Sequence, residues 1–168
     1  MIIVGIDPSL TATGICTDTD TWTAPERRFK GDARLHDLWL QVNMAVTGHD
    51  EKILAVVEDL PTHAHGAGKT GMAQGVVRHC LIDNRVPYIT VTAATLKKFA
   101  TGKGNCGKPD MMIELYKRTA IELRDDNQVD AWWLRQLGLH LVDDARRIDL
   151  PKTHLAALDK IDRTAVAG

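Results

Sequence analysis

The sequence predicts a single α/β domain with a mixed central sheet and helices on both faces of that sheet. The chain opens with two strand-like segments joined by a turn and then alternates helical and strand-like segments, an order typical of layered α/β structures. The segment Ile53–Val57 is continuously apolar, which indicates a strand covered on both faces. A length of 168 residues fits one domain of this kind.

The strands are predicted from short apolar runs bounded by turn-forming residues. The first run ends at Pro8–Thr11, a segment that favours a turn back into a second strand. A third strand is polar, and the last repeats the apolar pattern of the central one. The predicted strands are Met1–Asp7, Gly14–Thr19, Trp22–Phe29, Ile53–Glu58 and Val86–Val91.

The helices are predicted between and after these strands, where the pattern changes to a helical one. Pro109 suits a first helical turn, because that position has no use for a backbone N–H donor. The predicted helices are Ala33–Val46, Gly71–Asn84, Thr92–Ala100, Pro109–Glu122 and Asp126–Arg146. We assign residues 1–148 to the domain and 149–168 to a C-terminal extension. The amphipathic part of the extension, Thr153–Ala165, is either a loose tail or a partner-binding helix.

The composition is that of an ordinary globular protein, with 44% hydrophobic and 26% charged residues. No apolar run approaches the roughly 20 residues that span a bilayer, and the N-terminus enters a strand instead of a secretion signal. The three cysteines form no C-x-x-C pair, which argues against a disulfide framework and a zinc site. We therefore expect no membrane association and a cytoplasmic location, in a bacterial cell or in its host if the gene is phage-encoded.

The charge of the chain is balanced overall but uneven along the sequence. A net charge of −1 is unlike that of a dedicated nucleic-acid-binding domain. Local patches matter more than the total, however, because phosphates are bound by clustered lysines and arginines. The segment Leu96–Pro109 holds four lysines and no acidic residue: Lys97, Lys98, Lys103 and Lys108.

Acidic residues stand where strands end. Asp7 ends the first predicted strand and Glu58 ends the central one. If a β-α-β crossover makes these strands parallel neighbours, both carboxylates emerge at the same edge of the sheet. A third group opens the last helix, where helical spacing puts Asp126 and Asn127 on the same face as Asp130.

Such a cluster needs a neutralising cation. Two carboxylates about 4 Å apart repel by roughly 4 kcal/mol at an effective dielectric of 20. A cluster of oxygen ligands suits Mg²⁺ or Mn²⁺ better than zinc, and two such ions can bracket a phosphate in hydrolysis. Each acid alone could instead form a turn or cap a helix, so spacing by itself leaves a hydrolase and a structural role open.

Four segments in order resemble the RuvC family of Holliday-junction resolvases, within the ribonuclease-H-like superfamily. Gly5–Gly14 is similar to the opening strand-turn-strand motif with its metal-binding Asp, here Asp7. Val57-Glu58 is similar to the second motif, and Asp126–Ala131 to the final acidic helix with Asp130 as ligand. Lys97–Lys108 resembles the lysine-containing segment and Gly-rich loop.

The resemblance implies a ribonuclease-H-like fold and a homodimeric endonuclease. Such an enzyme binds four-way DNA junctions and nicks paired strands, leaving 5′-phosphate and 3′-hydroxyl ends. Two Mg²⁺ or Mn²⁺ ions per site would be held by Asp7, Glu58 and Asp130, with Asp7 between them. Of the basic residues, the resemblance matches Lys97 and Lys108. Our own hypothesis is that Lys108 stabilises charge at the reacting phosphate and that DNA is bound by Lys69, Lys97, Lys98, Lys103 and Lys108.

Two departures from the family pattern leave questions open. Asn127 stands where the family usually has Asp or His, so either Asn127 or the neighbouring Asp126 is the fourth ligand. The loop after Glu58 lacks the aromatic residue that the family commonly has there. His63 or His65 could take its place against DNA, or could simply be solvent-exposed.

The same residues are compatible with other functions. Gly68-Lys69-Thr70 resembles the end of a nucleotide-binding P-loop, but the motif needs a glycine where His63 stands, and we expect no nucleotide cofactor. An RNase-H-type ribonuclease would share the core and the acidic residues. A junction-binding protein with little or no cleavage is a further alternative, because Asn127 is a neutral ligand.

Overall fold

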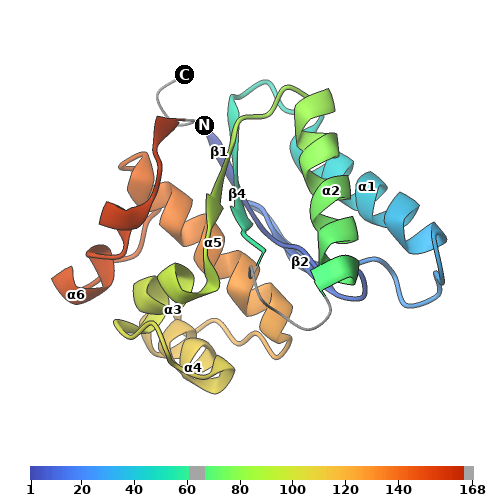
Figure 1. The fold of residues 1–168 in the computed structure, drawn as a ribbon. Helices are drawn as coiled ribbons and strands as arrows, with labels where there is room; N and C mark the ends of the chain where they lie inside the picture. Colours follow the sequence, from blue (N-terminus) through green and yellow to red (C-terminus); the bar gives the residue numbers. More distant parts are fainter. Residues whose placement is uncertain (61–66, 165–168) are drawn as a thin grey trace.

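A five-stranded mixed sheet forms the centre of the protein (Figure 1). The structure is a computed structural model and describes residues 1–60 and 67–164. The strand order is β3-β2-β1-β4-β5, in which β1 pairs antiparallel with β2 and parallel with β4. The strands are β1 (Ile2–Asp7), β2 (Thr13–Cys16), β3 (Thr21–Ala24), β4 (Ile53–Glu58) and β5 (Tyr88–Val91).

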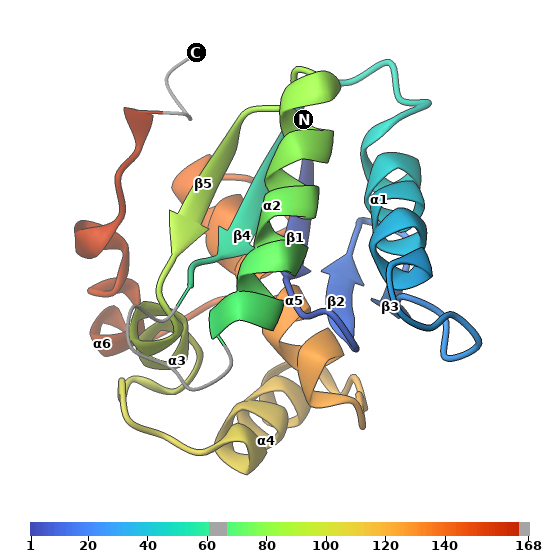
Figure 2. The same ribbon diagram turned by 45° about the vertical axis from the view of Figure 1, so that its right-hand side comes forward.

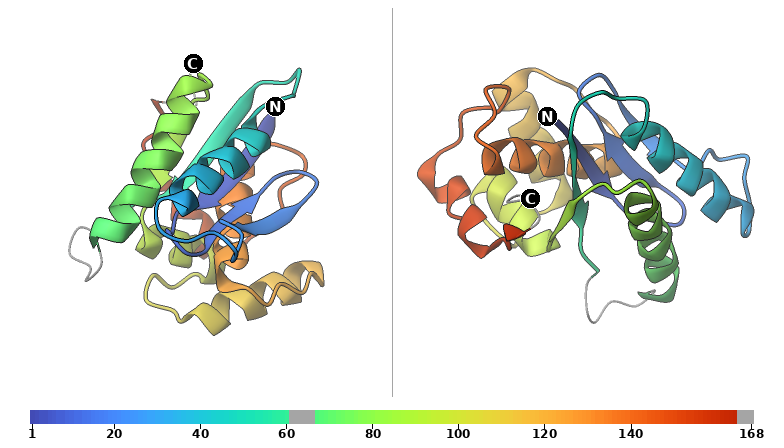
Figure 3. Two further views of the ribbon diagram at one scale, coloured as in Figure 1. Left: turned by 90° about the vertical axis from the view of Figure 1, so that its right-hand side faces the viewer. Right: turned by 90° about the horizontal axis from the view of Figure 1, so that it is seen from above.

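Helices cover both faces of the sheet, as the sequence predicted (Figures 1 and 3). One face packs against α1 and α2, and the other packs mainly against α5 and α3. Successive side chains of β1 alternate between the two faces of the sheet: Ile3 packs toward α5, and Val4 packs toward α1 and α2. The helices are α1 (Ala33–Val46), α2 (Ala67–Asp83), α3 (Ala93–Thr101), α4 (Lys108–Thr119), α5 (Asp126–Leu141) and α6 (Lys152–Leu155), followed by the 3-10 helix η1 (Leu158–Lys160).

The second and third strands are shorter than predicted. Thr17 N donates to the carbonyl of Asp20 at 2.9 Å, so Thr17–Asp20 form the turn of a hairpin and not part of a strand. Pro25 follows β3 directly and has no N–H to extend the ladder. The predicted second strand therefore extended into a turn, and the predicted third strand extended into an irregular segment.

Helix α5 ends at Leu141 and not at Arg146. Asp143 has a φ of 54°, a left-handed conformation that terminates the helix. Helix α4 likewise ends at Thr119, because Ala120 has a φ of 58° where the sequence predicted three more helical residues. Neither residue is a glycine, so the sequence carries no obvious stop signal at these positions.

Two glycines let α5 lie directly on the sheet. A Cβ added at Gly5 would stand 2.0 Å from the carbonyl oxygen of Ala131, and one at Gly14 would stand 1.9 Å from that of Asn127. Both distances are far below any real contact. The first half of α5 therefore rests against the backbone of β1 and β2, where only glycine fits.

The end of the chain packs on α3. His154 is buried, and its Nδ1 lies 2.9 Å from the carbonyl oxygen of Phe99. Ala157 is fully buried in the core on the same side of the sheet. Within the described residues this segment is thus not a loose tail, whereas the boundary at residue 148 stays a prediction. No helix in the described part of the chain is long and apolar enough to cross a membrane.

We predict that Gly14→Ala destabilises the protein by more than about 3 kcal/mol, since the added methyl group must push α5 away from the sheet. Gly75→Ala is the matched control. Gly75 lies in α2 with nothing near its Cβ position, so alanine there should stabilise by about 0.5 to 1 kcal/mol. Urea unfolding measures both. Equal effects of the two substitutions would contradict the close contact.

Candidate active site

Asp7 and Glu58 lie side by side at one edge of the sheet. They are the last residues of the parallel strands β1 and β4, and the register pairs Ile6 with Val57 immediately before them. The prediction that a crossover brings these two carboxylates together is therefore confirmed. Figure 2 shows the carboxyl ends of β4 and β5 directed toward α3.

Asp130 completes a pocket with these two residues. It lies one turn into α5, and the contact of α5 with Gly5 and Gly14 brings it to the same edge. The carboxylate pocket has a volume of about 190 Å³. Its charged lining residues are Asp7, Glu58, Asp130, Lys97 and Lys108, and its apolar ones are Ala93, Leu96 and Met111.

Burial and mutual repulsion make the three carboxyl groups hard to ionise. Burial, with repulsion from Glu58 and Asp130, raises the pKa of Asp7 well above its ordinary value. Burial and the charge of Asp130 raise the pKa of Glu58 to about 7, although Lys97 and Lys108 oppose the rise. The pKa of Asp130 rises to about 6, again mainly through burial. The two lysines do not neutralise the site.

Asp126 sits at the rim and pairs with Lys108. The Lys108 ammonium donates to the Asp126 carboxylate. Burial alone would lower the pKa of Lys108, but this hydrogen bond and the charge of Asp126 outweigh burial and raise it. Lys108 thus engages one oxygen of Asp126, and its positive charge disfavours a cation on the same carboxylate.

Asn127 is held by its neighbours. Asp125 caps α5 by accepting from the backbone N–H of Asn127 at 3.0 Å, and it also accepts from the Asn127 side-chain amide at 2.8 Å. Thr23 donates to the same Asp125 carboxylate at 2.6 Å. The bonds to Asp125 fix the orientation of the Asn127 side chain, whose carbonyl oxygen is the atom that could bind a cation.

A hydrogen-bond network from α2, which the sequence did not predict, holds the backbone at Glu58. Gln74 of α2 is buried, and its amide donates to the backbone carbonyl of Glu58. Its own oxygen accepts from Arg78 at 3.1 Å, and Arg78 donates to Asp59 at 2.8 Å. The sequence shows only that Gln74 lies on a helix, which gives no signal for this contact.

The other predicted DNA-binding residues either do not line the carboxylate pocket or fall outside the described residues. Lys98 is on α3 but does not line the carboxylate pocket, and Lys103 is exposed in the loop between α3 and α4. Lys69 is exposed in the first turn of α2. His63 and His65 lie outside the described residues.

The donor set fits a hard divalent cation in its chemistry. The three carboxylates that line the pocket offer only oxygen ligands, and a cation would relieve their repulsion. Within residues 1–60 and 67–164, however, no three His, Cys, Asp or Glu side chains are spaced closely enough to hold one ion as they stand. Binding would therefore require the carboxylates to move toward each other.

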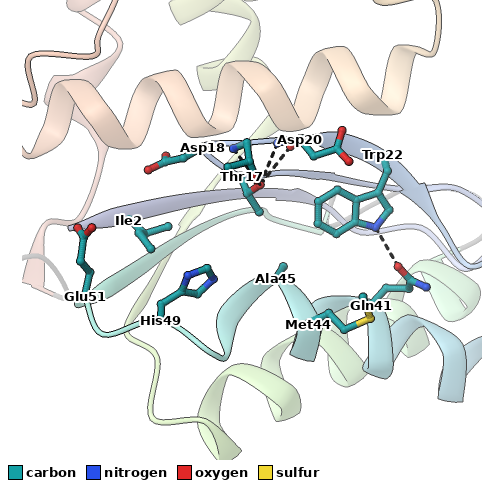
Figure 4. Close-up of a pocket in the computed structure, with 11 residues that line it drawn as sticks. Ile2, Thr17, Asp18, Asp20, Trp22, Gln41, Met44, Ala45, His49 and Glu51 are labelled. Atoms are coloured by element: carbon teal, nitrogen blue, oxygen red, sulfur yellow. Dashed lines mark hydrogen bonds between the residues drawn. The ribbon is translucent and has the colours of Figure 1, made fainter.

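A second, larger hollow lies at the opposite edge of the sheet (Figure 4). It has a volume of about 500 Å³ and lies between α1 and the turn that joins β2 to β3. Ile2, Met44 and Trp22 supply apolar surface, and Trp22 donates to Gln41 at 3.0 Å. Two of its carboxylates form ion pairs: Asp18 pairs with Arg135, and Glu51 with the N-terminal amine. The third, Asp20, accepts from the backbone N–H of Thr21 at 2.7 Å. The hollow offers no cluster like that of the carboxylate pocket.

The fold belongs to the α/β ribonuclease-H-like class, with a mixed five-stranded sheet and helices on both faces. Within that class the chain is similar to two solved structures of RuvC from Thermus thermophilus. One is described as RuvC in complex with Holliday junction substrate; the TM-score is 0.62 at 17% identity, covering 80% of this chain and 90% of that chain. The other is a RuvC structure with a TM-score of 0.65, again at 17% identity, covering 89% of this chain and all of that chain.

These likenesses confirm the fold that the resemblance implied. No protein-family model and no curated protein matches the sequence. The activity must therefore be argued from the site itself.

We predict that Glu58→Gln alters the pH dependence of stability in EDTA. A pKa raised to about 7 stabilises the folded state below pH 4.5, and this contribution is lost as the pH rises through 7. Glutamine cannot ionise, so the variant should gain on the wild type between pH 4.5 and 8, by on the order of 2 kcal/mol. Urea unfolding across this range measures the gain. The control is Glu122→Gln, at an exposed residue; a parallel profile for Glu58→Gln and Glu122→Gln would contradict the prediction.

Proposed function

We propose that the protein is a divalent-metal-dependent endonuclease that cuts four-way or other branched DNA junctions. The observation that carries the proposal is the carboxylate pocket, where Asp7, Glu58 and Asp130 arrive from three separated segments beside two lysines. The ribonuclease-H-like fold, similar to that of a RuvC described in complex with a Holliday junction, supports the choice of substrate.

Asp7, Glu58 and Asp130 are the residues that would hold the metal ions. Either Asp126 or Asn127 would be the fourth ligand. When bound, two Mg²⁺ or Mn²⁺ ions activate the attacking water and stabilise the leaving 3′ oxygen. Burial and repulsion now disfavour ionisation of these carboxyl groups. The bound ions would balance their negative charges.

Lys108 would act at the reacting phosphate. It lines the pocket and is held at its rim by Asp126. A phosphate that enters the pocket brings a competing negative charge, so Lys108 can leave Asp126 for the phosphate. The exchange would free the Asp126 carboxylate at the same time, which links DNA binding to completion of the ligand set.

The surrounding lysines would hold the DNA backbone without reading its sequence. Lys97 lines the carboxylate pocket, and Lys98, Lys103 and Lys69 lie further from it. His63 and His65 keep their proposed place against DNA. We also propose a homodimer, because a two-fold enzyme fits a junction of nearly two-fold symmetry and could cut two strands as a pair.

We predict that Asp7→Asn lowers the rate of cleavage of a synthetic four-way junction by at least about 100-fold in Mg²⁺ or Mn²⁺. Binding to the same junction in EDTA should be unchanged or tighter, since one charge that repels phosphate is removed. Gel-resolved cleavage and fluorescence anisotropy measure the two. Asp50→Asn, at an exposed residue before β4, is the control and should cleave normally.

The same assay separates the alternatives. Equal loss of binding and cleavage in Asp7→Asn would contradict a metal-ligand role. Tight junction binding without cleavage in either metal would favour a junction-binding protein, and a preference for an RNA–DNA hybrid would favour a ribonuclease.

A further inference from the structure

A second basic site lies on the far side of α3 from the carboxylate pocket. It is a hollow of about 530 Å³, here called the lysine hollow. Its lining residues are Thr92, Ala94, Thr95, Lys98, Gly104 and Lys160. They come from the first turns of α3, the loop that follows α3, and η1 near the end of the chain.

The lysine hollow is positively charged by its lining residues. Lys98 and Lys160, which are 62 positions apart in the sequence, both line it, and none of its lining residues is acidic. Within the described part of the chain neither lysine forms an ion pair, so their charge is not cancelled by a neighbouring carboxylate in contact. Two lysines on one concavity favour an anion.

The first turn of α3 does not itself account for this site. The Thr92 hydroxyl already caps the helix by accepting from the backbone N–H of Thr95. The loop fits closely against the helix, because a Cβ at Gly104 would meet the carbonyl oxygen of Ala94 at 3.2 Å. The hollow is therefore formed by α3 together with the loop and the C-terminal segment, and its charge comes from the two lysines.

Helix α3 lies between the two sites and contributes lining residues to both. Ala93, Leu96 and Lys97 line the carboxylate pocket, whereas Ala94, Thr95 and Lys98 line the lysine hollow. At 100° per residue these two sets lie on roughly opposite faces of the helix. A DNA strand cut in the carboxylate pocket could cross α3 and place a neighbouring phosphate in the lysine hollow.

The C-terminal segment is fixed well enough to serve as one wall. The Nδ1 atom of buried His154 lies 2.9 Å from the carbonyl oxygen of Phe99 in α3. Ala157, three residues before Lys160, is buried in the core. Figure 1 shows α6 beside α3. Lys160 is thus carried to α3 by packing, although it is distant from α3 in the sequence.

We propose that the lysine hollow binds a backbone phosphate of the DNA substrate through Lys98 and Lys160, which makes the C-terminal segment part of the DNA-binding surface. The inference rests on the proposed function, because it takes DNA as the ligand. It adds Lys160, a residue that the sequence motifs do not include, and gives Lys98 a defined partner in binding.

The test measures binding of a synthetic four-way junction to the full chain in EDTA at several salt concentrations. Lys160→Ala should weaken binding by about 3- to 10-fold, and the slope of log affinity against log salt should fall by up to about 1, as for loss of one phosphate contact. Lys160→Glu should weaken binding further. Lys152→Ala is the matched control: Lys152 is exposed in the same segment but does not line the hollow.

A double-substitution cycle tests whether the two lysines share one phosphate. If they do, Lys98→Ala and Lys160→Ala together should weaken binding by a factor clearly different from the product of their separate factors. Thermal unfolding should be unchanged in Lys160→Ala, since the side chain is exposed. Independent effects of the two substitutions would overturn the shared site.

The outcomes for this inference and for the proposed function are distinct. If the wild type binds and cuts the junction while Lys160→Ala and Lys160→Glu bind as it does, with the same salt slope, the lysine hollow is not a DNA site and the nuclease proposal stands. If the Lys160 variants bind DNA more weakly but the wild type cuts no junction in Mg²⁺ or Mn²⁺, the lysine hollow stands and the nuclease proposal fails.

Discussion

The direct contact of α5 with the backbone of β1 and β2 determines where the acidic side chains can lie. Gly5 and Gly14 leave no room for a Cβ between strand and helix, and the carbonyl groups of Ala131 and Asn127 occupy that room. Because a helix so placed cannot slide or lift without losing its packing, the second turn of α5 is held at the edge where β1 and β4 end. Asp130 joins Asp7 and Glu58 for this reason, and the catalytic proposal depends on it.

The resulting pocket is electrostatically unfavourable as it stands. Burial raises the pKa values of Asp7, Glu58 and Asp130, repulsion from neighbouring carboxylates adds to the rise, and Lys97 and Lys108 oppose it only in part. Polar contacts nevertheless keep the groups in place: Gln74 holds the backbone of Glu58, and Asp125 holds Asn127 at the start of α5. Such an arrangement, in which the surrounding structure enforces repulsion between like charges, is typical of a site that a cation completes.

The sequence predicted the features that depend on local pattern and on general rules of topology. Apolar runs predicted most of the strands, and the β-α-β crossover predicted the parallel pairing that brings Asp7 and Glu58 together. Contacts between distant segments could not be predicted. Nothing in the pattern shows that Gly5 and Gly14 face a helix, that Gln74 reaches β4, or that Lys160 returns to α3. The ends of α4 and α5 were also missed, because the left-handed residues there are Ala120 and Asp143 instead of glycine.

The central claim is that Asp7, Glu58 and Asp130 together bind divalent cations. Anomalous scattering from a crystal of the wild-type protein grown with Mn²⁺ tests it most directly, because manganese is located independently of the protein atoms. The account predicts one or two strong peaks between these three carboxylates, with metal–oxygen distances of about 2.0 to 2.3 Å. Well-ordered carboxylates with no peak between them at saturating Mn²⁺, or peaks confined to other parts of the surface, would contradict it.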